Sequence, residues 1–279
     1  MEEQLTDVFP EFREISVIDP LRQGDVLEAV ASTASHWQRH LLVLTADCDL
    51  AFAKHRGRVT CAPLLTAQEY LLETKIPDLR EKALVKFVGE LRKVLPDKNS
   101  NISDERIKAW PSEVAPDEII VLLGLTGQHA DVAEKVLKSI RLISHEAESL
   151  DDAVEALIES QASAPNAKSR DKIVDAVVQA LKAPLSQPPG DALFLSSIAP
   201  NNNLGYFAYL RHVEQVQESE IATSPGRKTV RYRRIARLQD RYIHALVQQF
   251  ALVFMSIGLP SEYEDMRRLH SEYLGETYQ

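Results

Sequence analysis

The 279-residue sequence has two cysteines, no long apolar run and no secretory signal pattern. Cys48 and Cys61 lack the spacing of a zinc site, so we expect reduced thiols in a cytosolic protein. No apolar run reaches the roughly 18 residues that a membrane-spanning helix needs. The start, Met-Glu-Glu, is acidic, whereas a secretory signal begins with basic residues. These absences predict a cytoplasmic protein without membrane contact.

Several common chemical signatures are also missing. There is no Gly-rich phosphate loop, no GxSxG elbow and no dinucleotide fingerprint, and the eight histidines lack metal-ligand spacing. We therefore expect neither a metal nor a cofactor. The net charge of −9 argues against a protein that coats nucleic acid with its whole surface. Any contact with RNA or DNA would have to come from a local basic patch.

Strand-like segments occur on both sides of a long helical stretch. Short runs rich in β-branched, leucine and aromatic residues, bounded by turn formers, predict strands at 24–30, 40–45, 58–63, 192–198, 206–216 and 229–235. Between them, apolar residues recur at helical spacing from Thr66 onward, where Thr66 to Glu69 has the form of a capping box. The Pro188-Pro189-Gly190 sequence ends this stretch.

The pattern predicts an α+β fold: a small antiparallel SH3-like β-barrel with a large all-helical insertion and a C-terminal amphipathic helix. The first part of the barrel is expected in 1–65, the insertion in 66–187, and the second part with the helix in 188–279. The helix spans 240–257 and carries an apolar stripe that includes Tyr242, Leu246, Phe250 and Phe254, which predicts that it covers one side of the barrel or, as the alternative, a partner subunit. Neither β region alone has enough strands for a stable closed sheet.

A short part of the chain, from Gly24 to Thr66, resembles the PemK/MazF-like toxins. The resemblance rests on Gly24-Asp25-Val26, on Arg39 directly before an apolar strand that ends in Thr45, and on Ala62-Pro63 in the next strand. It implies an SH3-like barrel and RNA cleavage. It further implies that Arg39 and a hydroxyl residue after the Pro-bearing strand form the cutting site, where the arginine would stabilise charge on a phosphate.

The sequence departs from that pattern at two positions. Leu65 occupies the place of the hydroxyl residue, and Thr66 comes one residue late. A one-residue shift turns a strand side chain to the other face, so Arg39 and Thr66 would form a catalytic pair only if the strand were bulged. His40 stands where the family has proline after the arginine. The alternative is that Arg39 is an exposed residue at a strand edge.

Asp47-Cys48-Asp49 directly follows an apolar strand and offers a possible rim site. Two carboxylates beside a thiol provide hard oxygen ligands or a nucleophile. Carboxylates next to a thiol disfavour its thiolate form, however. In an extended strand the alternative is a buried Cys48 with two acids that face outward.

A basic run stands out against the acidic average of the chain. If it is a strand, Arg231 and Arg233 lie on one face and Val230 and Tyr232 on the other, which suits contact with a phosphate backbone. The alternative is a charged edge strand that resists aggregation or pairs with acidic surface of the insertion. The candidate nucleic-acid-binding residues are Arg227, Lys228, Arg231, Arg233, Arg234 and Arg237.

Two functions remain open at this level. The first is a non-catalytic adaptor with a protein partner in a bacterial, toxin- or defence-type assembly. The incomplete catalytic pair and a helical stretch that no minimal nuclease needs favour this interpretation. The alternative is a nucleic-acid-binding protein or endoribonuclease that uses Arg39 and the basic strand 227–237.

Overall fold

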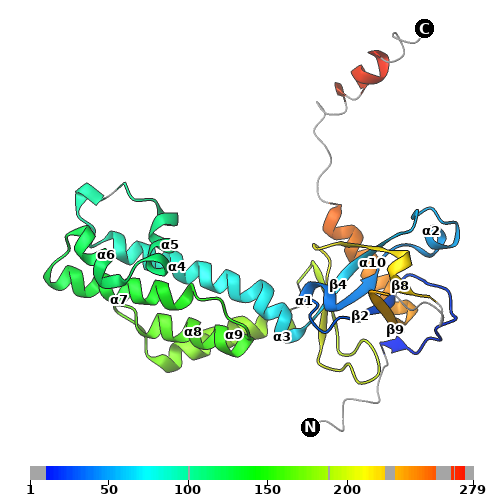
Figure 1. The fold of residues 1–279 in the computed structure, drawn as a ribbon, viewed down its shortest axis with the longest axis horizontal. Coiled ribbons are helices and arrows are strands. Elements are labelled where there is room, and N and C mark those ends of the chain that lie inside the picture. The colour runs from blue at the N-terminus through cyan, green and yellow to red at the C-terminus, as the bar shows by residue number, and fades with distance from the viewer. Residues whose placement is uncertain are drawn as a thin grey trace.

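The structure is a computed structural model that describes residues 11–99, 101–187, 189–223, 230–255, 265–266 and 268–273, and for Lys98 the backbone alone. The fold is α+β. The strands and α10 (Asp240–Phe254) form what we call the sheet region, residues 11–66 and 189–255. The helices between β4 and β5 form the helical region, residues 67–187, which extends to one side of the sheet (Figure 1). No helix in the described ranges has the length and hydropathy needed to cross a bilayer.

The strands form one open, curled sheet. They are β1 (Phe12–Arg13), β2 (Asp25–Ala29), β3 (His40–Val43), β4 (Arg58–Thr66), β5 (Ala192–Leu195), β6 (Tyr206–Tyr209), β7 (Glu214–Gln217), β8 (Ile221–Ala222) and β9 (Tyr232–Leu238). Their order is β1-β9-β2-β3-β4-β6-β5, with β7 also on β4 and β8 on β9, and only the β8–β9 pair is parallel. Within the described residues β1 and β5 remain unpaired edges, so the sheet is a half-barrel and the predicted closed barrel is corrected.

The predicted strand 206–216 is in fact two strands. β6 pairs with the end of β4, from Leu64 to Thr66, whereas β7 pairs with its beginning, from Arg58 to Cys61. The chain turns away between them, where the Leu210 amide donates to the Asp191 carbonyl. The long strand β4 therefore pairs with β7 along its first half and with β6 at its end, and the sheet branches at this strand. The predicted strand 229–235 is β9, which starts at Tyr232; residues 224–229 lie outside the described residues.

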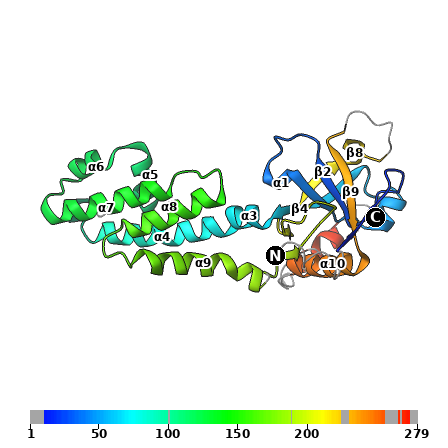
Figure 2. The same ribbon diagram turned by 90° about the horizontal axis from the view of Figure 1, so that it is seen from below.

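The remaining helices follow the predicted pattern closely in the helical region. They are α1 (His36–Arg39), α2 (Asp47–Ala51), α3 (Ala67–Tyr70), the π-helix η1 (Leu71–Lys75), α4 (Ile76–Arg92), η2 (Asp97–Asn99), α5 (Asp104–Glu113), α6 (Pro116–Leu123), α7 (Gly127–Ile143), α8 (Leu150–Ala162), α9 (Arg170–Ser186) and η3 (Glu218–Glu220). The predicted capping box is confirmed: the Thr66 hydroxyl accepts from the Glu69 amide, and the Glu69 carboxylate accepts from the Thr66 amide. From this cap, α3, η1 and α4 run as one continuous helix out of the sheet region (Figure 2).

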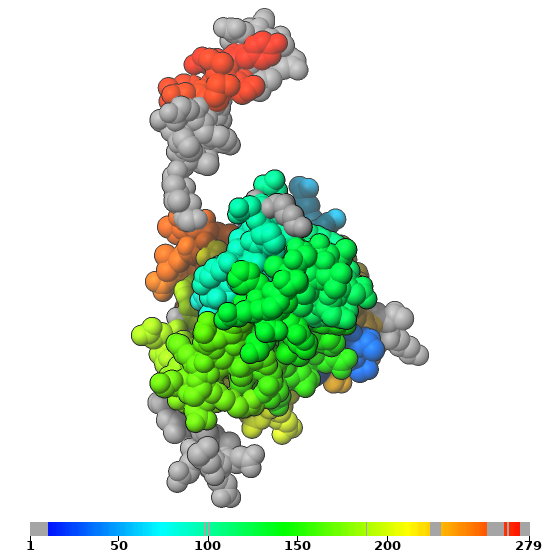
Figure 3. Space-filling view, turned by 90° about the vertical axis from the view of Figure 1, so that its left-hand side faces the viewer, coloured from blue at the N-terminus to red at the C-terminus, as the bar shows by residue number. Residues whose placement is uncertain are grey.

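The helical region has a hydrophobic core of its own. Buried apolar residues from α4 to α9, with Phe87, Ile140 and Leu157 among them, form one cluster. Seen from this end of the molecule, the helices gather as a bundle in front of the sheet region (Figure 3). The amphipathic faces predicted from the sequence are therefore buried against one another.

The two faces of the sheet carry separate hydrophobic clusters. On one face, Ile243 and Leu246 of α10 pack with residues such as Val26 and Leu64. On the other face, Leu21 and Leu50 pack against a second cluster. Figure 2 shows α10 beneath the strands. The helix is shorter than predicted, ending at Phe254, a residue of the predicted stripe that is exposed.

Gly24 lies where α10 approaches the sheet. A Cβ at this position would stand 2.4 Å from Ile243 Cδ1, and the backbone φ of +84° is one that residues with side chains rarely adopt. The glycine of the Gly24-Asp25-Val26 tripeptide thus permits the close contact between strand and helix.

Asp25 is fully buried between two arginines of β9. Arg237 Nε and Arg234 Nη1 both donate to its carboxylate, and the arginine side chains are only 6% and 2% exposed. The same guanidinium groups donate to the backbone carbonyls of Asp19 and Pro20. This triad therefore fastens residues 17–20 to the sheet.

Asp25→Asn removes the charge on which both buried arginines depend. Breaking a buried ion pair leaves an uncompensated charge, so we expect the free energy of unfolding to fall by about 3–5 kcal/mol in urea denaturation. Asp240→Asn is the matched control, because Asp240 and Arg13 form an exposed pair worth about 0–1 kcal/mol. Equal losses in the two variants would contradict the structural role of the triad.

Leu246 and Val247 are neighbours in α10 with opposite environments. Leu246 is fully buried against the sheet, whereas Val247 is 37% exposed. We expect Leu246→Ala to lower the free energy of unfolding by about 2–5 kcal/mol, and Val247→Ala to change it much less. A thermal or chemical melt of both variants measures this, and a neutral Leu246→Ala would show that α10 does not cover the sheet in solution.

Candidate functional site

Arg39 and Thr66 meet at the carboxylate of Glu69. Arg39, the last residue of α1, donates from Nη1 to Glu69 Oε1, while the Thr66 amide donates to Glu69 Oε2 at 2.8 Å. The Glu69 side chain is only 9% exposed, and that of Arg39 is 42% exposed. The two residues that the resemblance selects thus share one nearly buried partner at the surface of the sheet region.

The one-residue offset of Thr66 does not separate it from Arg39. The β4–β6 register is regular from Leu64 to Thr66, so the bulge that the sequence required is not present there. The strand instead ends at Thr66 and α3 begins, and the first turn of α3 delivers Glu69 to both residues. Thr66 reaches the Glu69 carboxylate through its backbone amide, so the pairing of Arg39 with the Thr66 hydroxyl stays a prediction.

A second ionic contact lies beside the first. His36, at the start of α1, places Nδ1 2.9 Å from Glu73 Oε1 and Nε2 4.0 Å from Glu69 Oε1. Two basic residues of α1 thus face two carboxylates of α3 and η1. The sequence pattern identified Glu69 only as a helix cap and did not select His36 or Glu73.

His40 adds a buried imidazole to this end of the sheet. Among the described residues neither ring nitrogen has a hydrogen-bond partner, and Glu28 Oε1 lies 3.6 Å from Nε2. Burial lowers the pKa of His40, which keeps the ring neutral near pH 7. The Tyr206 ring stands edge-on to it at 5.8 Å, and burial raises the pKa of Tyr206 to about 12.

The basic run divides between the two faces of β9. Arg233 faces outward and binds Glu28 at 2.6 Å, and Arg231 Nη2 donates to Gln38 Oε1 at 2.9 Å. Arg234 and Arg237 instead lie in the triad around Asp25, where a nucleic-acid backbone cannot reach them. Arg227 and Lys228 lie outside the described residues.

The exposed arginines join the cluster around Glu69. Cross-strand pairing places Arg233 opposite Glu28 and Glu28 opposite His40, so the three form one row across β9, β2 and β3. Arg231 reaches Gln38, the residue before Arg39. The structure thus brings the two sets of sequence candidates to one end of the sheet.

Asp47, Cys48 and Asp49 lie elsewhere and are helical. They form the first turn of α2, so Cys48 is exposed and the predicted alternative of a buried thiol in a strand is wrong for this residue. Asp47 Oδ1 accepts from the Gln23 amide at 2.8 Å, a bond that holds the turn before β2. The carboxylate of Asp47 therefore has a structural role in the backbone before β2.

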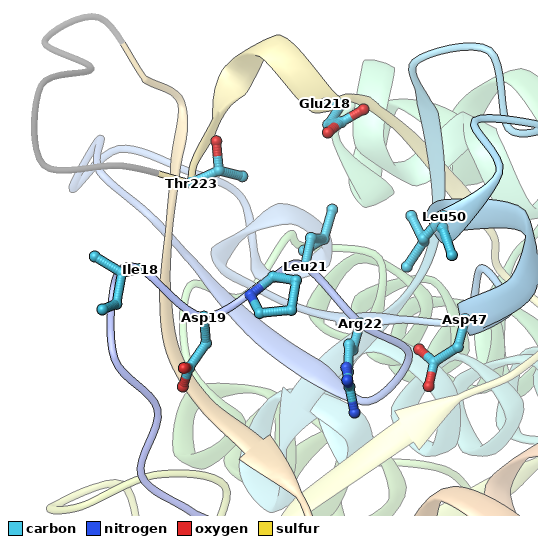
Figure 4. Close-up of a pocket in the computed structure, with 10 residues that line it drawn as sticks. Ile18, Asp19, Leu21, Arg22, Asp47, Leu50, Glu218 and Thr223 are labelled. Atoms are coloured by element: carbon cyan, nitrogen blue, oxygen red, sulfur yellow. The ribbon is translucent and has the colours of Figure 1, made fainter.

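A cavity of about 540 Å³ opens beside α2 (Figure 4). Its lining includes Leu21 and Arg22 on one wall, Asp47 and Leu50 on another, and Glu218 across from them. The cavity lining thus combines carboxylates and a guanidinium with the apolar side chains of Leu21 and Leu50. Among the described residues no three His, Cys, Asp or Glu side chains gather as metal ligands would.

His55 connects α2 with η3 beside this cavity. Its Nδ1 lies 3.0 Å from the Asp49 carbonyl oxygen and its Nε2 2.8 Å from Glu218 Oε2. Both partners are acceptors, so both nitrogens donate only when the ring is an imidazolium. The bond to the Asp49 carbonyl, and then that to Glu218, raises the pKa of His55.

Comparison of the chain with protein-family models, with curated proteins and with solved structures finds no match.

The raised pKa of His55 predicts a pH-dependent contribution to stability. A histidine whose folded pKa exceeds its unfolded pKa, about 6.5, stabilises the fold fully below that value and loses the contribution as pH rises through the folded pKa. We expect His55→Gln to destabilise the protein at pH 6 and to approach the wild type at pH 9 in urea denaturation. His129→Gln, at an exposed position of α7, is the control and should show no such dependence. A His55→Gln effect that grows with pH would contradict the imidazolium assignment.

Proposed function

We propose that the protein binds RNA at the Glu69 cluster and cleaves it there. The observation that carries this proposal is the shared carboxylate: Arg39 and Thr66, which the resemblance to RNA-cutting toxins selects, both bond to Glu69. Arginine binds phosphate groups through its planar fork of donors, and a half-exposed Arg39 remains accessible to one.

The groups of the cluster match the needs of phosphodiester cleavage. Glu69 is the candidate proton acceptor for a ribose hydroxyl, and Arg39 is the candidate for stabilising charge that develops on the phosphate. Thr66 contributes a hydroxyl and fixes the carboxylate through the capping box. Arg231 and Arg233 lie exposed beside the cluster, Arg231 on the uncharged Gln38 and Arg233 on Glu28, and are candidates for further phosphate contacts.

The same proposal includes the identity of the sheet. We regard it as an opened variant of the SH3-like barrel, interrupted between β4 and β5 by a helical insertion. Support comes from β4, which pairs with β6 and β7 from beyond the helices. A cytoplasmic location, where RNA is present, belongs to this proposal.

The tip of the helical region favours a second function, that of an adaptor for a protein partner. Val121 and Leu122 on α6 are 78% and 66% exposed, adjacent in sequence and remote from the sheet (Figure 1). Large apolar side chains together at a surface mark contact sites. If this function alone holds, a photo-crosslinker at position 122 should capture a defined protein and Val121→Ser should abolish capture, while RNA assays stay negative.

A cleavage assay with Arg39→Ala tests the RNA proposal. Removing a group that stabilises transition-state charge typically costs about 10²–10³-fold in rate, so we expect a loss of that size on short single-stranded RNA. Arg141→Ala, at an exposed position of α7, is the matched control and should cleave like the wild type. Glu69→Gln separates the roles: it should reduce cleavage while RNA binding persists.

The salt dependence of binding gives a second readout. Each phosphate contact that is lost should lower the slope of log affinity against log salt by about 0.7 for single strands. Wild-type protein that neither binds nor cleaves RNA would overturn the proposal and leave the adaptor function.

A further inference from the structure

A ladder of aromatic rings runs from the core to the surface beside the Glu69 cluster. The Phe207 and Tyr70 rings stack at 4.1 Å, and Tyr70 meets Tyr209 at 6.1 Å. Tyr209 contacts Trp37 at 5.8 Å, and Trp37 stacks on His212 at 4.8 Å with an interplanar angle of 30°. Phe207 is fully buried, whereas the His212 side chain is 44% exposed.

The elements that hold this ladder are the ones that hold the ionic cluster. Trp37 stands two residues before Arg39 in the single turn of α1, and Tyr70 directly follows Glu69 in α3. The ionic contacts Arg39–Glu69 and the aromatic packing of Trp37 on the cluster around Tyr70 thus fix α1 from two sides. Trp37 and Arg39 are two residues apart in α1, about 3 Å along its axis, and their side chains leave the helix on opposite sides.

Packing explains the inner rungs of the ladder but not its outer end. Phe207 and Tyr70 bury their rings fully or nearly so, as core residues do. The outer rings are half-buried or exposed, and the polar His212 continues the stack toward solvent, with Nε2 3.1 Å from Glu214. Sites that bind unpaired nucleotides combine exposed rings, on which bases stack, with cations along the phosphate backbone, and here the rings and Arg39 flank the same short helix.

We infer that Trp37 and His212 form a stacking subsite for one unpaired base of an RNA whose phosphate lies at Arg39. The inference rests on the proposed function and explains how the site would select single-stranded over double-stranded RNA. Bases inside a duplex are already stacked on each other, so the subsite accepts unpaired bases and rejects double-stranded RNA. Arg39 and Arg233 contact Glu69 and Glu28, whereas Arg231 donates to the uncharged Gln38 and so adds an exposed positive charge for a phosphate beside the subsite.

Intrinsic fluorescence gives a direct test, because the chain has only two tryptophans. Trp110 lies in α5 of the helical region, so Trp110→Phe leaves Trp37 as the single reporter. The probes are a short single-stranded oligoribonucleotide, the same strand with abasic positions, and its duplex. We expect the intact single strand to quench Trp37 and to bind about tenfold or more tightly than the abasic strand or the duplex.

Substitutions assign the effect to the ladder. Trp37→Ala, in the chain that retains Trp110, should weaken binding of the intact strand about tenfold by a method that uses labelled RNA, and should leave binding of the abasic strand unchanged. Trp37→Phe, which keeps a ring, should restore most of the affinity. His212→Ala is a second variant at an exposed position, so a loss of affinity there would not reflect unfolding. Arg39→Ala should weaken the intact and the abasic strand equally.

The outcomes separate the two proposals. If Arg39→Ala loses RNA while Trp37→Ala and His212→Ala bind the intact strand like the wild type, the subsite is wrong and the proposed function stands; the ladder is then packing or a protein contact. Equal affinity of the wild type for intact and abasic strands would overturn the subsite in the same way. If the wild type binds none of the three probes, both proposals fail.

Discussion

The buried carboxylate of Asp25 constrains most of what surrounds it. Removing a charged group from water costs several kcal/mol. Its partners offset this cost only when their geometry is good and all hydrogen bonds are made. Here Arg234 and Arg237 provide that geometry, and their remaining donors take backbone carbonyls from residues 17–20. One side chain thereby sets the β2–β9 register and fastens the segment that forms a wall of the 540 Å³ cavity. Gly24, directly before it, sets the approach of α10 to the sheet.

The triad also decides which arginines face solvent. Arg234 and Arg237 are three residues apart, so a regular strand would turn them to opposite faces. The register shift opposite Val26 and Leu27 leaves Ile235 as an extra residue and turns both toward Asp25. Arg233 remains on the face of Glu28 and His40. The bulge in β9 thus sorts a uniform basic run into a buried half and an exposed half.

The sequence was sufficient to predict local features, but not which arginines of β9 are buried and which are exposed. Apolar runs and the capping box located the longer strands, the helical region and the start of α3, because those signals depend on neighbours in the chain, but they missed β1, β8, α1 and α2. The division of 206–216 into β6 and β7 depends on how β4 is shared, which no local pattern records. The burial of Arg234 and Arg237 likewise depends on a partner 209 and 212 residues away. Glu69 carried a visible signal, its place in the capping box, but its contact with Arg39 required the tertiary structure.

Under the proposed function, Glu69 has a double role, one in the fold and one at the RNA. Its bond to the Thr66 amide is part of the helix start, so the carboxylate keeps its position whether or not Arg39 is bound. Arg39 is half-exposed, so water can replace Glu69 at its guanidinium, whereas the nearly buried Glu69 keeps the Thr66 amide as a partner. A phosphate offers Arg39 a bidentate partner that compensates for losing Glu69. Because the cap stays in place when Arg39 moves, the carboxylate that becomes free remains next to the group that the arginine has taken, as acid–base chemistry at that group requires.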